Sequence, residues 1–212
     1  MADSSADIFF DLTAPGGGKV EGDCQDAKWA GLIEVDDFEL SGRSNDDRQK
    51  EKDQDTDEDD AGGGKKKGKK EGKKKGKKKS DEQGAFTLKI TKDTDRSSPD
   101  LALSYSKNLH SVRECFPEGR LLLRKRGAHN FIFLTILFKD LYVVKYQLSM
   151  SGGKGAGAAN IPDEDIEFVF ESCAFRYMVQ TTTGGGSKPI IIGWDFKQHE
   201  RDSNLEKKLS KP

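Results

Sequence analysis

The feature that most constrains this fold is a charged stretch of 41 residues, Arg43–Gln83, whose only apolar side chain is Ala61. A stretch of this composition cannot bury enough apolar surface to offset the entropy of ordering the chain. The hydrophobic core must therefore form between the residues on its two sides. These number about 171, which is enough for one domain with a sizeable core.

The charge of this stretch is divided by sign. Asp46–Asp60 carries nine acidic and three basic residues, whereas Lys65–Lys79 carries eleven lysines and one glutamate. The net charge of −1 is thus a cancellation and says little about partners. Lysine clusters attract phosphate backbones, but this one has no arginine to read bases and no aromatic residue to stack on them. We interpret residues 43–83 as a disordered loop, and a polyanion- or nucleic-acid-binding module using residues 65–79 is the alternative.

Outside the charged stretch, apolar residues recur with the period of β-strands. Residues 85–92 alternate cleanly, with Phe86, Leu88 and Ile90 on one face. The continuous apolar run Phe131–Phe138 is typical of a strand covered on both faces. The predicted strands are Asp7–Thr13, Leu32–Leu40, Ala85–Lys92, Arg120–Arg126, Phe131–Phe138, Leu141–Leu148, Asp165–Tyr177 and Ile190–Phe196.

Seven or eight strands with long loops rich in glycine, serine and threonine predict a mainly β fold, an antiparallel β-barrel that is closed or nearly closed. Closure also hides the edges of strands as apolar as Phe131–Phe138. The alternation slips between Val35 and Phe38, where we expect a bulge. Lys139 and Asp140 form a second break, between two apolar runs.

One short helix interrupts this pattern. Ser97 or Ser98 suits the N-cap, Pro99 suits the first helical position, and Asp100 suits the first turn. The helix is predicted to end near residues 108–110. Its expected apolar side consists of Leu101, Leu103, Tyr105 and Leu109. The tail from residue 200 to 212 is polar, and we expect it to be flexible.

The histidines and cysteines do not form a recognisable catalytic or metal site. His110, His129 and His199 lie in or beside predicted loops, and no pair has the spacing of metal ligands. His110 and Cys115 flank one loop, but a catalytic thiol needs a base within reach and an oxyanion site, and nothing in the sequence marks either. We expect no catalytic, cofactor-binding or metal-binding residues. An enzyme is a third interpretation, and its turnover would depend on His110 or Cys115.

The remaining candidate groups favour ordinary structural roles. Asp36, Asp37 and Glu39 lie on a predicted strand and imply no cleft, so we expect an exposed face rather than acid–base chemistry. The glycine clusters lack the Gly-Lys-Ser/Thr ending of a phosphate-binding loop and are interpreted as flexible connections. They are Gly16–Gly18, Gly62–Gly64, Gly152–Gly157 and Gly184–Gly186.

Cysteine usage and the apolar runs indicate where in the cell the protein is located. Cys24, Cys115 and Cys173 are odd in number and match no disulfide framework, so we expect reduced thiols in a cytoplasmic protein. The N-terminus has no basic region followed by a long apolar run, so we expect no signal peptide. The apolar run 130–148 contains three charged residues and is too polar to span a bilayer. If the protein leaves the cell, we expect it to do so without the general secretory route.

Six stretches, in order, resemble the Hcp family, whose members form the tube of bacterial type VI secretion systems. The stretches are DIFFDLT with VEGDCQDAKWAG, GLIEVDDFEL, FTLKITKDTDRSSPDLALSYS, GRLLLRKRGAHNFIFLTILFKDLYVVKYQLS, DIEFVFESCAFRYMVQ and IIIGWDFKQHE. They resemble the family patterns V-x-G-x-x-Q-D-x-K, G-x-I-E-V-x-x-F, K-x-x-D-x-S-S-P-x-L, A-x-L-x-I-R-K-x-G, E-x-V-x-F-x-F-x-x-I-x-x-x-Y and G-W-D-x-x-x-N. Together they extend from residue 7 to residue 200 on both sides of residues 43–83, and their occurrence in the family's order makes the resemblance specific.

The resemblance implies a β-barrel with one helix, related in fold to phage tail-tube proteins. It further implies a homohexameric ring, stacking of rings into a tube, and propulsion of that tube by a contractile sheath with a spike at its tip. Members of the family also bind effectors in the lumen. These properties describe a structural, non-enzymatic protein that is secreted by a Gram-negative bacterium as a virulence factor.

The sequence departs from the family pattern in two places. The loop at residues 43–83 is much longer than usual, and its two charge blocks are atypical of a loop that lies near ring-to-ring contacts in the family. The closing motif has His199 where an asparagine is usual.

Overall fold

A computed structural model describes residues 6–42, 86–110, 112–125, 131–150, 161–179 and 186–211. The chain divides into a unit made of Met1–Leu40 and Thr87–Pro212 and a smaller unit, Ser41–Phe86. The first unit contains the fold described below. The predicted charged loop, residues 43–83, lies outside the described residues.

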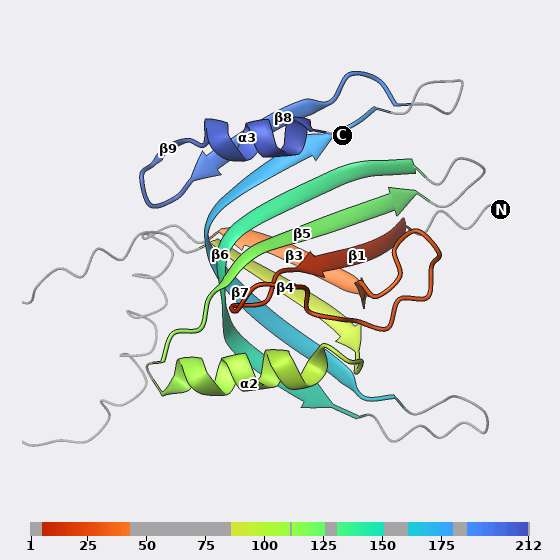
Figure 1. Ribbon diagram of the computed structural model, residues 1–212, viewed down its shortest axis with the longest axis vertical. Helices are drawn as coiled ribbons and strands as arrows, with labels where there is room; N and C mark the ends of the chain where they lie inside the picture. Colours follow the sequence, from red (N-terminus) through yellow and green to blue (C-terminus); the bar gives the residue numbers. More distant parts are fainter. Residues whose placement is uncertain are drawn as a thin grey trace, which may run out of the picture. The chain divides into compact units, whose positions relative to one another are not determined.

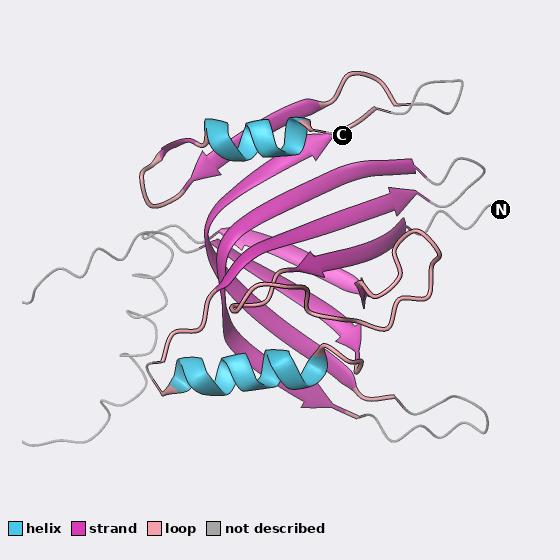
Figure 2. Ribbon diagram, viewed as in Figure 1, coloured by secondary structure: helices cyan, strands magenta, loops and turns pink. Residues whose placement is uncertain are grey.

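The fold is built on one antiparallel sheet (Figures 1 and 2). Its strands follow the order β2-β1-β5-β6-β7-β4-β3, with β8 paired to β7 and β9 paired to β8. The strands are β1 (Ala6–Leu12), β2 (Ile33–Val35), β3 (Asp37–Gly42), β4 (Phe86–Asp93), β5 (Phe116–Lys125), β6 (Phe131–Ser149), β7 (Asp163–Tyr177), β8 (Ile190–Asp195) and β9 (Glu200–Arg201). The mainly β, antiparallel prediction is therefore confirmed.

Strand pairing does not close this sheet within the described ranges, so of the predicted closed or nearly closed barrel the closed form is excluded. No ladder there joins β2 to β3, although they stand at the two ends of the strand order. These two strands are nevertheless consecutive in the chain, with only Asp36 between them. The Asp36 amide donates to the Thr91 carbonyl oxygen on β4 at 2.9 Å. The slip predicted between Val35 and Phe38 is thus the point where the chain leaves β1 and joins β4.

The longest strand, β6, combines two predicted strands. The break predicted at Lys139 and Asp140 is a single residue in the left-handed region, Asp140, with φ of 53°. The ladder with β7 continues on both sides of it, since Lys139 pairs with Ser172 and Leu141 with Phe170. One aspartate, a residue type that tolerates this conformation, therefore lets β6 remain continuous.

The core is built from the apolar faces of the strands that the alternation predicts. Leu88 and Ile90 of β4 are fully buried, as are Ile166 and Phe168 of β7. Phe168 makes edge-to-face contacts with Phe10 at 5.8 Å and with Phe116 at 6.5 Å, which joins β7 to β1 and β5. Such pairs add about 0.5–1.5 kcal/mol beyond the burial of their area.

The predicted helix is confirmed as α2 (Ser98–Leu109), but its apolar side is only partly correct. Leu101 is buried, whereas Leu103 and Leu109 are 52% and 64% exposed. Ser97 is the N-cap but makes no side-chain capping bond; its hydroxyl donates to the Asp95 carboxylate instead. Helix α2 therefore leaves an apolar surface uncovered in this unit.

A second helix, α3 (Ser203–Ser210), corrects the prediction of a single helix and of a flexible tail at residues 200–212. Asp202 caps it by accepting hydrogen bonds from the amides of Asn204 and Leu205, each at 3.0 Å. Leu205 and Leu209 are buried in a cluster with Leu137 and Ala174. Two leucines at i and i+4 thus bury one face of a segment that is otherwise polar.

Helix α3 approaches β8 most closely at Gly193. A Cβ atom on Gly193 would lie 2.7 Å from the backbone oxygen of Asp202 and 3.2 Å from Cγ of Glu206. The Gly193 amide donates to Glu206 at 2.9 Å, and its carbonyl accepts from the Asp202 amide at 3.1 Å. Glycine is required here because the two backbones are almost in contact.

We predict that Gly193→Ala lowers the free energy of unfolding by about 1–3 kcal/mol, because the added methyl group overpacks the contact with α3. Gly16→Ala is the matched control, since nothing lies within 4 Å of a Cβ at that position. Denaturant unfolding of both variants measures the difference. An equal effect of the two substitutions would show that α3 does not pack closely on Gly193.

Candidate functional site

A buried lysine lies where β4 meets the start of α2. Lys92 extends the core-facing row Leu88–Ile90, and its side chain is fully buried. Its ammonium group lies 2.8 Å from a carboxylate oxygen of Glu164, which is also fully buried, and 2.7 Å from Asp95. It also donates to Ser98 Oγ at 3.1 Å and to the Asp93 carbonyl oxygen at 2.9 Å.

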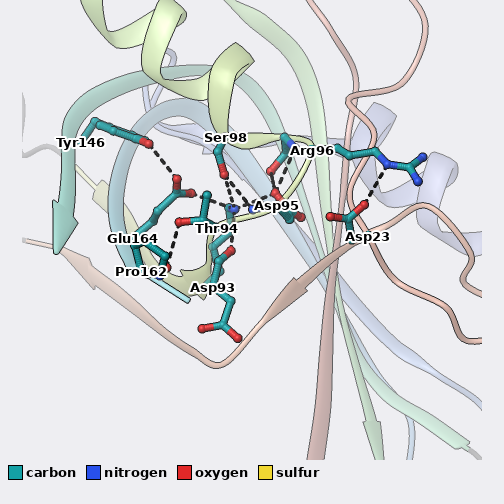
Figure 3. A network of polar contacts seen from close by, with 11 residues as sticks. Asp23, Asp93, Thr94, Asp95, Arg96, Ser98, Tyr146, Pro162 and Glu164 are labelled. Atoms are coloured by element: carbon teal, nitrogen blue, oxygen red, sulfur yellow. Dashed lines mark hydrogen bonds and ion pairs between the residues drawn. The ribbon is translucent and has the colours of Figure 1, made fainter. Parts of the chain in front are cut away.

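Tyr146 completes this arrangement from β6. Its hydroxyl donates to Glu164 at 2.7 Å, as Figure 3 shows. Burial, followed by this hydrogen bond, raises the pKa of Tyr146, so the phenol keeps its proton at neutral pH. The ring of Tyr105 on α2 stacks on that of Tyr146 with centroids 6.5 Å apart. We call Lys92, Asp95, Ser98, Tyr146 and Glu164 the Lys92 network.

The Lys92 network ties the start of α2 to three strands. Asp95 accepts from the Ser97 amide, and its own amide donates to Ser98 Oγ. Thr94 donates twice to the Pro162 carbonyl oxygen, from its amide at 2.9 Å and its hydroxyl at 2.8 Å. The lysine is enclosed and makes four polar contacts, so this arrangement positions a helix and gives no substrate access to a titratable group.

A second ion cluster fixes the loop between β1 and β2. Arg124 of β5 contacts Asp7 and Asp26, each at 2.6 Å, and its guanidinium lies 5.0 Å from the Phe9 ring centroid. The hydrogen bond from Arg124 lowers the pKa of Asp26. Phe9 stacks on Trp29 of the same loop with centroids 6.0 Å apart. This cluster is a structural attachment of the loop to the sheet.

The structure does not bring His110 and Cys115 together as a catalytic pair. His110 is exposed at the C-terminal end of α2, and the Cys115 thiol donates to Asp140 at 3.7 Å. Burial is the main cause that raises the pKa of Cys115, which disfavours the thiolate needed for attack. Cys24 and Cys173 are buried and free, and burial raises the pKa of Cys173 to about 12.

The other candidate residues also fail to form a site. Asp36, Asp37 and Glu39 are exposed, and partial desolvation, followed by the charges of neighbouring carboxylates, raises the pKa of Asp36. The described ranges contain no group of three or more His, Cys, Asp or Glu side chains able to hold a metal ion. His129 and the lysine block 65–79 lie outside those ranges. None of the described helices is long and apolar enough to span a membrane.

Two exposed apolar surfaces are more informative than any of these groups. The first is a row on β8, in which Ile190, Ile192 and Trp194 alternate and are 66%, 55% and 43% exposed. Ile191 points the other way, into the cluster beneath α3. We call these three side chains the β8 row. The sequence predicted the strand but not the exposure, because β8 pairs with β7 on one side and is covered by α3 on one face only.

The second surface is a groove between α2 and β6 with a volume of about 230 Å³. Leu109 of α2 and Val144 of β6 are its exposed apolar walls, with Tyr142 and Val169 between them. The Arg113 guanidinium lies 5.9 Å from the Tyr142 ring centroid at its rim. We call this the α2–β6 groove. Asn108 holds the two walls together by donating to the Val143 carbonyl oxygen at 3.0 Å.

Known proteins resemble this chain in sequence and in fold. A family model described as "Type VI secretion system effector, Hcp" matches residues 11–177. A solved structure of a type six secretion system protein is 22% identical with a TM-score of 0.64, and the match covers 93% of this chain and 100% of that chain. Hcp1 from Salmonella typhimurium is 21% identical, with a TM-score of 0.59 and coverage of 93% and 99%.

The secreted protein Hcp3 from Pseudomonas aeruginosa is more distant in sequence. It is 11% identical with a TM-score of 0.53, and the match covers 90% of this chain and 98% of that chain. At these identities the solved structures show a common fold. Among curated proteins, none matches this sequence.

We predict that Lys92→Met lowers the free energy of unfolding by about 3–5 kcal/mol, because it leaves Glu164 charged and buried without its partner. The double variant Lys92→Met/Glu164→Leu should recover much of that loss. Lys89→Met is the matched control, since Lys89 is half-exposed on the same strand and its pair with Asp165 is worth at most about 1 kcal/mol. Equal losses for Lys89 and Lys92, measured by denaturant unfolding, would contradict the prediction.

Proposed function

The chain belongs to the Hcp family of the type VI secretion system, and we propose that it forms homohexameric rings that stack into the tube which this system secretes. The observation that carries the proposal is the family match over residues 11–177, because it extends from β1 to the end of β7. This match supports a structural component of the secretion tube. It gives no support to the alternative of a polyanion-binding module.

The chemistry of the described residues supports a structural role. The ionisable groups of the Lys92 network are enclosed and paired with one another. The Cys115 thiol donates to a carboxylate rather than to a histidine. Large apolar side chains, in contrast, are exposed on β8 and α2, where a monomer gains nothing from them. We therefore propose a protein that acts by self-association and not by catalysis.

The proposed tube has further partners. As a member of the inner tube, the protein would contact the sheath around it, the spike at its tip and effectors in its lumen. It would be made in the cytoplasm and leave through the type VI apparatus.

The purified full-length protein should form rings with six-fold symmetry and a mass six times that of the 23.5 kDa chain. Negative-stain electron microscopy gives the symmetry, and light scattering after size exclusion gives the mass. The reason is that exposed apolar surfaces on one chain favour association. A protein that stays monomeric at high concentration would contradict the proposal.

We also propose that the charged insertion, residues 43–83, acts between subunits. Its acidic block 46–60 and its basic block 65–79 have opposite charges, so the acidic block of one subunit can attract the basic block of a neighbour. Each exposed pair contributes only about 0–1 kcal/mol, so several pairs must act together. Such a contact depends strongly on ionic strength.

Raising the salt concentration to about 0.5 M, where the Debye length is about 4 Å, should weaken the stacking of rings. A variant in which the lysines of residues 65–79 are replaced by glutamine keeps the length of the insertion and should lose that salt dependence. Sedimentation of stacked rings measures both effects. Stacking that is indifferent to salt would exclude this role, and loss of the rings themselves would assign the insertion to the ring contact.

A further inference from the structure

The β8 row and the α2–β6 groove lie beside different parts of β7. On β7, Phe175 pairs with Ile192 of the β8 row, and Phe168 pairs with Val143 beside the groove. Seven residues separate Phe175 from Phe168, which is roughly 23 Å along a strand at about 3.3 Å per residue. Figure 1 shows the same separation, with β8 and α2 at opposite ends of the curved sheet. The two surfaces therefore cannot touch within one chain.

One of the two surfaces consists of projecting side chains and the other is a hollow. The β8 row consists of three large side chains that project from alternate positions of one strand, and it spans roughly 13 Å. The groove is a hollow of about 230 Å³ with aliphatic and aromatic walls. A row of side chains on a strand fits a hollow lined by Leu109, Tyr142 and Val144 better than it fits a second flat row.

The rim of the groove carries a cation, and the rim of the β8 row carries carboxylates together with the Arg201–Glu206 ion pair. Arg113, at the rim of the groove, stacks on Tyr142 and has no carboxylate partner among the described residues. Beside the β8 row, Asp195 and Glu200 are register partners across the ladder between β8 and β9. Carboxylates placed opposite each other repel, and a cation from another chain would relieve that repulsion.

From these observations we propose that the β8 row of one subunit docks into the α2–β6 groove of the next copy of this chain. The proposal rests on the ring-forming function proposed above and assigns its subunit contact. Two different surfaces in contact make a heterologous interface, which closes into a ring when the rotation between subunits allows it. The aromatic and aliphatic side chains form the buried centre of that contact, and the rim charges set its orientation.

The contact can be broken from either side without touching the core. Ile190→Glu/Ile192→Glu changes only exposed side chains of the β8 row, and Leu109→Glu/Val144→Glu changes only exposed walls of the groove. Each double variant should weaken ring formation by about 30-fold or more, which is the effect of losing a central contact residue. Ile161→Glu replaces an equally exposed apolar side chain outside both surfaces and should leave rings intact. Thermal unfolding within a few degrees of the unchanged protein verifies that each variant folds.

Mixing the two double variants tests that the contact is heterologous. The β8 variant keeps a working groove and the groove variant keeps a working β8 row, so one contact remains possible between them. The mixture should therefore give a dimer of twice the 23.5 kDa chain mass, while each variant alone stays monomeric. A contact between two β8 rows would give no dimer on mixing.

A charge exchange provides an independent measurement. Arg113→Glu should weaken association, and the added change Glu200→Arg should restore it, because every subunit supplies both rims. Failure of this restoration would remove Glu200 from the contact.

The outcomes separate this contact from the proposed function. Rings that persist in both double variants, or a mixture that yields no dimer, overturn the docking and leave the ring proposal standing. If the unchanged protein forms open chains and the mixture still forms a dimer, the proposal of a ring is overturned and the docking is supported. An unchanged protein that remains monomeric overturns both.

Discussion

The ammonium group of Lys92 lies between β4, β7 and the start of α2, and its side chain is fully buried. It is stable there because two carboxylates, a hydroxyl and a carbonyl oxygen surround it. Desolvating a charge is costly, so the buried Lys92–Glu164 pair adds little net stability. Its effect is to hold the groups around Lys92 in one geometry. Since Asp95 and Ser98 belong to the turn that begins α2, the position of the helix against β6 follows from this geometry. Because the Lys92 network fixes the start of α2 against β6, it also fixes the two walls of the α2–β6 groove.

The sequence predicts the strands well because burial repeats every second residue, and the alternation of 165–174 matches what the structure buries. Lys92 follows Leu88 and Ile90 at the next core-facing position of β4. Its partner Glu164 is two residues before Ile166 on the same face of β7. A charged residue in an apolar row normally indicates the end of a strand, so only the three-dimensional pairing of β4 with β7 identifies the two as partners.

Other features depend on contacts between distant segments and were beyond sequence reasoning. Helix α3 was missed because Leu205 and Leu209 are two apolar residues among polar ones, and their burial depends on Leu137 and Ala174. Leu103 and Leu109 belong to the predicted apolar side of the helix, yet both are exposed on α2. The two ends of the sheet are also not joined by a ladder. β2 and β3 are one chain segment that changes partner at Asp36, from β1 to β4, instead of two strands that pair with each other. The first five of the six stretches that resemble the Hcp family overlap residues 11–177, which a family model matches, so the family could be predicted from sequence more readily than these contacts.

The pairing of β1 with β5 affects how the chain reaches its fold. Ile8 pairs with Leu123, 115 positions later. Contacts between residues so far apart form slowly, because a long loop must close before any energy is gained. During synthesis, β1 remains without its β5 partner until the ribosome has passed Lys125. The apolar strand Ala6–Leu12 is then a candidate binding site for chaperones, and folding of this sheet is a late event in the making of the protein.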